Sequence, residues 1–293
     1  MKKLLLLLIF SCPIFSFAQP VTLFQQFNGR YDFTAVGNTL NEFPNSVGSY
    51  CDMLLQSSEN LNLGPGTTII SAQLYWSSVG TGDFDVALNG IPVSAQRTFS
   101  YARAGLQYFA AQADVTDIVT STGNGTYTFS EMDVFAVLND YCFQSNYGGW
   151  AMYVIYEDPS LLLNQISLFD GLESVSNVNF PLSITLTGID VTSDVLSKIG
   201  FLAWEGDQTL AISESLTING TLISNPPLNP ANNAFNSTNS YILPSGDPFN
   251  YQMDLDYYDL VGIVQPGDTS ILIELTSGQD YIMVHNIITS VNS

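Results

Sequence analysis

The centre of the sequence carries an apolar run that has to be buried on both sides. Trp150 to Tyr156 contains no charged residue and lies between Gly148-Gly149 and the turn Glu157-Asp158-Pro159. Such a run is either a strand inside a sheet covered on both faces or a short buried helix, and its aromatic and β-branched side chains favour the strand. Together with the apolar residues up to Leu172, it predicts a hairpin that closes a first β-domain.

The chain on both sides of this run has the same character. Short β-type runs alternate with clusters of Gly, Pro, Asn and Asp, and no long stretch shows helical periodicity. With 46% hydrophobic and 12% aromatic residues, the chain has enough apolar material for sizeable cores. These features predict an all-β fold of two tandem antiparallel β-sandwich domains of the jelly-roll type, over residues 19–175 and 176–293.

A repeated pattern supports two related units. Val86 to Ser94 (VALNGIPVS) resembles Leu216 to Ser224 (LTINGTLIS), about 130 residues further on. Asn-Gly supplies the two positive-φ positions of a tight hairpin turn, so each copy predicts a hairpin. Leu74-Tyr75-Trp76 is echoed in the same order by Leu202-Ala203-Trp204. The alternative is one large sandwich with internal pseudo-symmetry.

The amino-terminal residues predict export. Residues 1–18 combine Lys2-Lys3, a short apolar core and a small-residue site that would be cleaved between Ala18 and Gln19, as in a secretory signal peptide. The expected location is extracellular or at the cell surface, with the periplasm possible. Cys51 and Cys142 are the two cysteines left after cleavage, and in an oxidising compartment they predict a disulfide.

The charge restricts the partners. The formal net charge of −21 becomes −23 once Lys2 and Lys3 leave with the signal peptide. Such a surface repels phosphate backbones and anionic lipids, so we expect neither nucleic-acid binding nor membrane insertion. Extracellular calcium is a better-motivated partner for clustered carboxylates. The tentative calcium ligands form two groups, which are Asp254, Asp256 and Asp259, and Asp83 with Asp85; the alternative is a solvated acidic surface.

Catalytic patterns are sparse. The single histidine, His285, lies inside an apolar run, where a packed residue is more common than a catalytic base, and it cannot build a zinc site alone. A glycosidase would need only two carboxylates, and the candidates are Glu131, Asp133, Glu157, Glu173, Glu205 and Glu214. Aromatic residues that could form a sugar platform are Tyr31, Tyr101, Tyr108, Tyr257 and Tyr258.

Several stretches resemble a known group of proteins. Tyr147 to Leu172, Leu202 to Thr238, Met253 to Asp256 and Gly267 to Thr269 are similar to the amino-terminal β-rich region of large secreted surface proteins of Bacteroidota, of the gliding-motility and type IX secretion kind. The resemblance implies an exported, adhesin-like β-module, and it carries over no catalytic residues. The chain departs from the pattern by ending at Ser293 without a recognisable sorting domain, so we expect a truncated or stand-alone relative, or a periplasmic one.

The sequence therefore predicts a secreted, non-catalytic adhesin-like or surface-structural β-sandwich module. Its partner would be an extracellular glycan or a surface protein. A calcium-assisted carbohydrate-binding module is the alternative, and a glycan-degrading enzyme is the third hypothesis.

Overall fold

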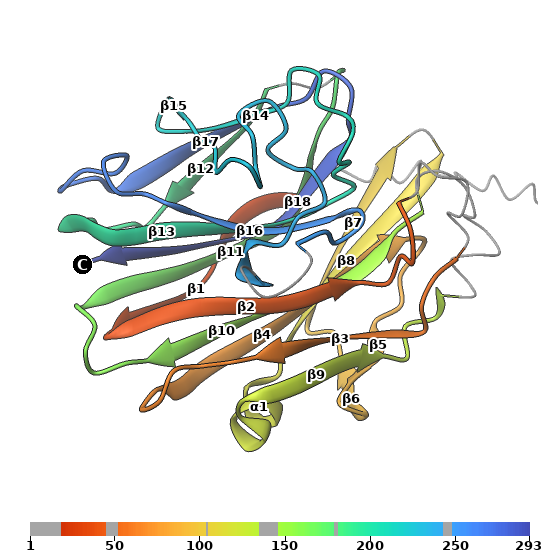
Figure 1. Ribbon diagram of the computed structural model, residues 1–293, viewed down its shortest axis with the longest axis horizontal. Coiled ribbons are helices and arrows are strands. Elements are labelled where there is room, and N and C mark those ends of the chain that lie inside the picture. Colours follow the sequence, from red (N-terminus) through yellow and green to blue (C-terminus); the bar gives the residue numbers. More distant parts are fainter. Residues whose placement is uncertain (1–18, 45–51, 104, 135–145, 179–180, 243–247) are drawn as a thin grey trace, which may run out of the picture.

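The computed structural model describes residues 19–293 except 45–51, 104, 135–145, 179–180 and 243–247 (Figure 1). The predicted signal peptide and the predicted Cys51–Cys142 disulfide lie outside the described residues. The described elements, in chain order, are β1 (Gln19–Gly29), β2 (Tyr31–Thr39), β3 (Gln56–Leu61), β4 (Thr68–Val79), β5 (Asp85–Leu88), β6 (Ile91–Ser94), β7 (Arg97–Arg103), β8 (Leu106–Asp114), α1 (Thr116–Thr122), β9 (Gly125–Ser130), β10 (Gly148–Glu157), β11 (Asn164–Val175), β12 (Leu182–Thr187), β13 (Ser193–Trp204), β14 (Ser215–Ile218), β15 (Thr221–Leu222), η2 (Ser240–Ile242), β16 (Met253–Asp259), β17 (Ser270–Thr276) and β18 (Ile282–Asn292).

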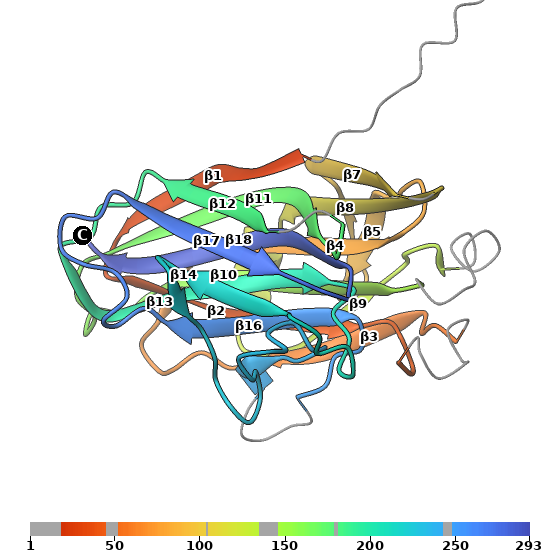
Figure 2. The ribbon, with the colours of Figure 1, turned by 90° about the horizontal axis from the view of Figure 1, so that it is seen from above.

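The described strands form four antiparallel sheets that lie on top of one another. The order through the stack is outer sheet 1 (β3-β9-β5-β6), inner sheet 1 (β2-β10-β4-β8-β7), inner sheet 2 (β1-β11-β18-β13-β16) and outer sheet 2 (β12-β17-β14-β15). A hydrophobic core fills each of the three spaces between neighbouring sheets. Figure 1 shows the stack from β3 and β9 at the bottom to β12 and β17 at the top, and Figure 2 shows it from above. The predicted all-β sandwich fold is confirmed.

The central apolar run is a strand buried on both faces, as predicted. In β10, Trp150 and Met152 pack into the core between the two sheets of the first sandwich, whereas Ala151 and Tyr153 pack into the core between the two inner sheets. Side chains alternate across a strand, so an inner sheet needs apolar residues at every position. The predicted hairpin is wrong. β10 pairs with β2 and β4, whereas β11 pairs with β1 and β18 in the next sheet.

The two units have the same strand order. In the inner sheets β2-β10-β4-β8 corresponds to β11-β18-β13-β16, and in the outer sheets β3-β9-β5-β6 corresponds to β12-β17-β14-β15. Both Asn-Gly hairpins form, and Asn89 and Asn219 adopt φ values of 52° and 48°. The side-chain oxygen of each asparagine accepts a hydrogen bond from the neighbouring strand, from the amide of Thr128 at 2.8 Å and of Leu272 at 2.9 Å. We name these units the first repeat (β2 to β10) and the second repeat (β11 to β18).

The sheets divide the chain differently from the predicted boundary between residues 175 and 176. That boundary leaves β11 with the first domain, whereas β11 begins the second repeat and β1 adds a further strand beside it. The polar residues near the end of β11 resemble a linker in the sequence, but they are bonded inside the sheet. Glu173, for example, accepts a hydrogen bond from the amide of Val21 at 2.8 Å.

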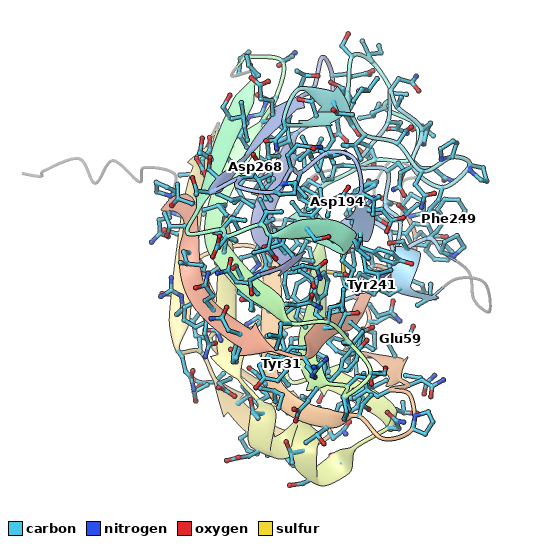
Figure 3. The ribbon with its side chains drawn as sticks, turned by 90° about the vertical axis from the view of Figure 1, so that its left-hand side faces the viewer. Tyr31, Glu59, Asp194, Tyr241, Phe249 and Asp268 are labelled. Carbon is cyan, nitrogen blue, oxygen red and sulfur yellow. The ribbon has the colours of Figure 1, made fainter. Side chains whose placement is uncertain are left out.

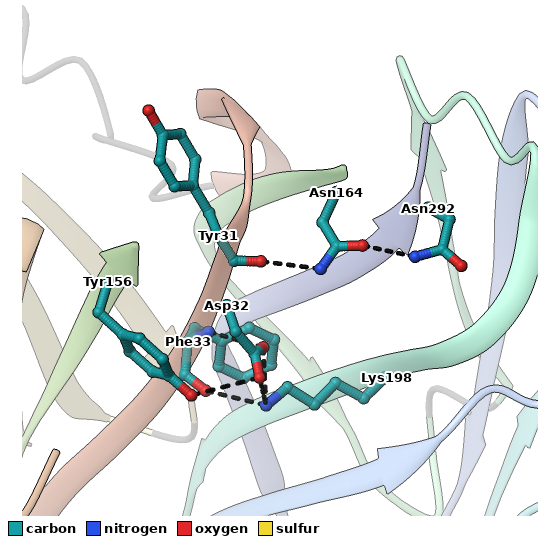
Figure 4. Close-up of polar contacts among 7 residues, drawn as sticks. All are labelled: Tyr31, Asp32, Phe33, Tyr156, Asn164, Lys198 and Asn292. Atoms are coloured by element: carbon teal, nitrogen blue, oxygen red, sulfur yellow. Dashed lines mark hydrogen bonds and ion pairs between the residues drawn. The ribbon is translucent and has the colours of Figure 1, made fainter. Parts of the chain in front are cut away.

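Two ion pairs join the repeats. The guanidinium group of Arg97 makes two hydrogen bonds to the fully buried carboxylate of Asp170, at 2.8 and 2.9 Å. Lys198 Nζ lies 2.8 Å from Asp32 Oδ1 and donates to the carbonyl oxygen of Phe33 at 2.9 Å (Figure 4). The repeats are therefore held together by directional contacts as well as by the central core.

Within the described residues, no helix has the length and apolar character needed to cross a membrane.

Candidate functional site

The two repeats differ most in residues 225–252. In the first repeat β7 forms the edge of inner sheet 1, where it pairs with β8 along its whole length. In the second repeat no strand among the described residues pairs with the outer edge of β16. A segment of irregular structure lies beside it, with an isolated bridge between Asn239 and Leu255 and a hydrogen bond from the amide of Leu255 to the carbonyl oxygen of Thr238 at 2.9 Å. We call the described residues of this segment, 225–242 and 248–252, the edge segment.

Two carboxylates on β16 hold the edge segment in place. Asp254 and Asp256 lie on the same face of the strand and are buried. Asp254 Oδ1 accepts hydrogen bonds from the amides of Asn236 at 2.7 Å and Thr238 at 3.2 Å. Asp256 accepts from the amide of Ser240, from the hydroxyl of Thr238 and from the side chain of Asn229, each at 3.0 Å. These bonds satisfy backbone and side-chain donors that would otherwise lack a partner away from water.

The structure separates the predicted calcium ligands. Asp259 points away from Asp254 and Asp256 and is exposed. In the first repeat, Asp83 accepts a hydrogen bond from the amide of Asp133 at 2.6 Å, and Asp85 accepts one from the hydroxyl of Ser94 at 2.5 Å. In the part of the chain that the structure describes, no three Asp, Glu, His or Cys side chains converge as a metal site would require.

Calcium is therefore expected to leave the stability of the protein unchanged. The melting temperature should be the same in excess EDTA as in millimolar CaCl₂, because the best-placed carboxylates already accept protein donors. Differential scanning calorimetry measures this directly. A melting temperature that rises with calcium would show that the ion binds the folded state.

The carboxyl groups near the edge segment form a buried acidic cluster. Glu205, Asp207, Glu214 and Asp280 join Asp254 and Asp256 there. Burial raises the pKa of Glu214 to about 10, of Asp280 to about 8 and of Asp256 to about 7. Burial also raises the pKa of Asp254 and of Glu205 well above the ordinary carboxyl range, with neighbouring carboxylates adding to the shift. Burial thus favours the protonated, neutral form of these carboxyl groups.

These carboxyl groups also accept hydrogen bonds from main-chain amides. Glu214 Oε1 accepts from the amide of Phe235 at 2.6 Å, and Asp280 accepts from the amides of Asp207 at 2.9 Å and Tyr281 at 2.6 Å. Of the six carboxylates predicted for a glycosidase, the structure brings only Glu205 and Glu214 into this cluster. The others lie elsewhere in the fold. The bonding of the cluster indicates a scaffold for the edge segment.

The edge segment carries a surface pocket of about 460 Å³. Its wall combines apolar rings and side chains with carboxamides, contributed by Gln208, Pro227, Leu228, Pro230, Asn233, Asn236, Pro248 and Phe249. Phe249 is 39% exposed, and Figure 3 shows it at the outer surface of the molecule. Asn233 donates to the carbonyl oxygen of Gln208 at 3.0 Å, whereas its own side-chain oxygen is buried and has no hydrogen-bond partner among the described residues. We call this cavity the Phe249 pocket.

None of the site residues predicted from the sequence lines this pocket. Of the predicted aromatic platforms, Tyr108 and Tyr258 are buried in the cores, and Tyr257 is the most exposed residue of the Tyr257-Tyr258 pair. The signal that could have identified the pocket is the Asn- and Pro-rich stretch 225–239, which has no counterpart in the first repeat.

His285 is fully buried and accepts a hydrogen bond from Trp204 at 3.3 Å, and burial lowers its pKa to about 3. It is a packed residue.

No family model matches the chain, and no curated protein matches it. Among solved structures, the chain is similar to BpGH86A, a β-porphyranase of glycoside hydrolase family 86 from the human gut bacterium Bacteroides plebeius, with 12% identity and a TM-score of 0.30 over 94% of this chain and 36% of that one. Wild-type BuGH86 in complex with neoagarooctaose has 11% identity and a TM-score of 0.27, over 93% of this chain and 33% of that one. The major capsid protein P2 from bacteriophage PM2 has 13% identity and a TM-score of 0.22, over 89% and 96%. The chain spans about a third of the length of the two enzymes.

Proposed function

We propose that the protein is an exported, adhesin-like binding module that acts without catalysis and holds a neutral glycan in the Phe249 pocket. The observation that carries this proposal is the combination, in one pocket, of the exposed phenyl ring of Phe249 with the exposed carboxamide group of Gln208. Sugars have the matching chemistry, because their C–H faces pack on aromatic rings and their hydroxyl groups donate to amide oxygens.

Charge supports a neutral ligand. None of the described residues that line the pocket is charged, and the chain carries a strong net negative charge. A sulfated or carboxylated polymer would be repelled by this surface, whereas a neutral polysaccharide would not. The pocket volume of about 460 Å³ is also within the range of roughly 300–1,000 Å³ for small-molecule sites.

A rigid frame supports binding without conformational change. The carboxyl groups of Asp254, Asp256 and Glu214 tie the edge segment to β16 and to the turn before β14 through buried hydrogen bonds. A site that is ordered before it binds loses less entropy on binding. The predicted export and the resemblance to surface proteins support this proposal, because an exported module would meet extracellular glycans.

Replacing Phe249 with alanine is expected to weaken glycan binding at least about fivefold, because an aromatic contact contributes roughly 1 kcal/mol beyond the area that it buries. A glycan array with neutral and anionic oligosaccharides, probed in EDTA and again in CaCl₂, identifies the ligand class. Calorimetric titration of the wild-type protein and the variant then gives the two dissociation constants.

The matched control is Phe43→Ala. Phe43 is 43% exposed, close to the exposure of Phe249, and it lies in the first repeat. This variant should bind like the wild type, and both variants should keep the wild-type melting temperature. The proposal is wrong if the array shows no binding, if binding is confined to anionic glycans, or if Phe249→Ala binds as tightly as Phe43→Ala.

A further inference from the structure

One end of the second repeat exposes a group of aliphatic side chains. Neighbouring strands of an antiparallel sheet run in opposite directions, so the start of β11, the end of β18, the start of β13 and the end of β16 meet at one end of inner sheet 2. Figure 1 shows this end beside the carboxyl terminus. The exposed aliphatic residues there are Leu162 (51%), Leu163 (56%), Val195 (49%), Leu196 (69%) and Val261 (56%). We call these five residues the Leu196 patch.

Hydrogen bonds join the chain segments that carry the Leu196 patch. The carbonyl oxygen of Leu163 accepts from the amide of Ser293, at the end of β18, at 3.3 Å, and β18 pairs with β13. In β13 the carboxylate of Asp194 accepts from the amide of Gly262, which follows Val261, at 2.8 Å. Adjacent strands are about 5 Å apart, so the patch extends over about 15 Å of the sheet end.

Leu196 has a backbone conformation that leucine rarely adopts. Its φ is 58°, in the left-handed region where a side chain crowds the main chain. The register of β13 against β18 shifts between Ser193 and Lys198, so Leu196 lies in a bulge. The strained residue is also the most exposed of the patch, so it contributes little to a core. Backbone strain is concentrated at functional sites, and this strain presents an apolar side chain to solvent.

The surroundings of the Leu196 patch are acidic. Of the cations described at this end, Lys198 is paired with Asp32, and Arg30 donates to the carbonyl oxygen of Leu161. Figure 3 views the molecule from this end and labels two of the carboxylates. The carboxylates in the strand ends and turns around the patch are those of Asp158, Asp190, Asp194, Asp259 and Asp268.

We propose that the Leu196 patch is a docking surface for a basic polypeptide. Its apolar side chains would cover Leu196 and the neighbouring residues, and its lysine or arginine side chains would pair with the surrounding aspartates. An exposed apolar patch with a polar rim is typical of a protein interaction site. Charge complementarity selects the partner, because a second copy of this chain would bring carboxylates against carboxylates. The surface is separate from the proposed glycan site, since no residue of the patch lines the Phe249 pocket.

The test selects ligands for the wild-type protein from a phage-displayed library of random twelve-residue peptides. We expect the selected peptides to combine lysine or arginine with large apolar residues. Fluorescence polarisation with a synthetic copy of the most enriched peptide then gives the dissociation constant. Binding should weaken when NaCl is raised from about 50 to about 500 mM, because salt screens the interaction of exposed charges.

Two glycine variants locate the binding surface. Leu196→Gly should bind the peptide at least about tenfold more weakly, because it removes an apolar side chain that the partner buries. The matched control is Leu222→Gly, since Leu222 is 53% exposed and lies in β15, outside the patch. This control should bind like the wild type.

The melting temperatures of the same variants separate docking from a role in the fold. Glycine adopts positive φ without strain, so Leu196→Gly should melt at the wild-type temperature or above it. Leu222→Gly should melt at a lower temperature, because glycine weakens a strand. A lower melting temperature for Leu196→Gly would show that Leu196 supports the fold, and the proposal would then be wrong.

The binding measurements can also overturn the proposal. It fails if the selected peptides have no excess of basic residues, if Leu196→Gly binds them as tightly as Leu222→Gly does, or if salt leaves the affinity unchanged. Sedimentation velocity gives a further test, for which we expect a monomer. A dimer that Leu196→Gly dissociates would show that a second copy of the chain covers the patch in place of a basic partner.

Discussion

Raising the pH from 6.5 to 8.5 is expected to lower the free energy of unfolding by about 3–5 kcal/mol. Burial raises the pKa of Asp256 to about 7, of Asp280 to about 8 and of Glu214 to about 10 in the folded protein. In the unfolded chain such groups titrate near pH 4. The folded state therefore binds more protons than the unfolded state between these limits, so the stability that the protonated carboxyls contribute is lost as the pH rises through the folded-state pKa values.

The choice of pH window isolates the carboxyl groups. Burial lowers the pKa of His285 to about 3, so the unfolded chain binds a proton there that the folded protein does not. The stability from this histidine is complete above its unfolded pKa of about 6.5 and falls below it. Above pH 6.5 its contribution is nearly constant, and the buried acidic cluster dominates the pH dependence.

Urea denaturation at pH 6.5, 7.5 and 8.5 measures the effect as a falling unfolding midpoint. The variant Glu214→Gln should reduce the pH dependence, because glutamine keeps an oxygen that can accept from the amide of Phe235 but does not titrate. The matched control is Glu42→Gln at an exposed position. The unfolding midpoint of this variant should depend on pH as that of the wild type does. A midpoint that is constant or that rises with pH would contradict the prediction.

Replacing Arg97 with alanine is expected to destabilise the protein by about 2–4 kcal/mol. The variant leaves the carboxylate of Asp170 buried without its bidentate partner, and burial already raises the pKa of this group. The lower part of the range applies because the Arg97 side chain is 37% exposed in its ion pair. The cost should be smaller at acid pH, where Asp170 becomes protonated and no longer needs a cation.

The control for Arg97→Ala is Lys198→Ala. The ion pair of Lys198 and Asp32 also joins the two repeats. Its two side chains are 19% and 21% exposed, so both have access to water. Its loss should cost about 1 kcal/mol. Urea denaturation of both variants, together with Asp170→Ala and the double variant Arg97→Ala/Asp170→Ala, gives the coupling energy. An Arg97→Ala variant that is as stable as Lys198→Ala would show that Asp170 does not depend on the ion pair.

The predictions that the structure confirms rest on patterns among residues that are adjacent in the sequence. Trp150 to Tyr156 could be identified as a doubly buried strand because apolar residues at successive positions leave no face for water. Both Asn-Gly hairpins could be identified because the turn needs positive φ at two adjacent residues, which Asn89-Gly90 and Asn219-Gly220 supply. The repeat itself follows from the order of such local patterns.

The predictions that failed depend on contacts between distant residues. The same apolar pattern that made β10 a strand could not show that its successor β11 enters a different sheet, because that is decided by β1 and β18. The cation site suggested by Asp254 and Asp256 stays a prediction, and the sequence could not show that amides of the edge segment donate hydrogen bonds to their oxygens. Phe249 became a candidate only when the structure placed it beside Asn233 and Gln208.

The sequence by itself thus determined that this protein is an all-β, strongly acidic chain built from two related sandwiches, because strand burial and turn geometry depend on residues that are adjacent in the sequence. Only the tertiary structure decided how the sheets stack, which acidic groups are buried and accept hydrogen bonds from the edge segment, and where a pocket opens. Those properties arise from burial and from donors that lie far apart along the chain, and a buried carboxyl has the same local sequence as an exposed one.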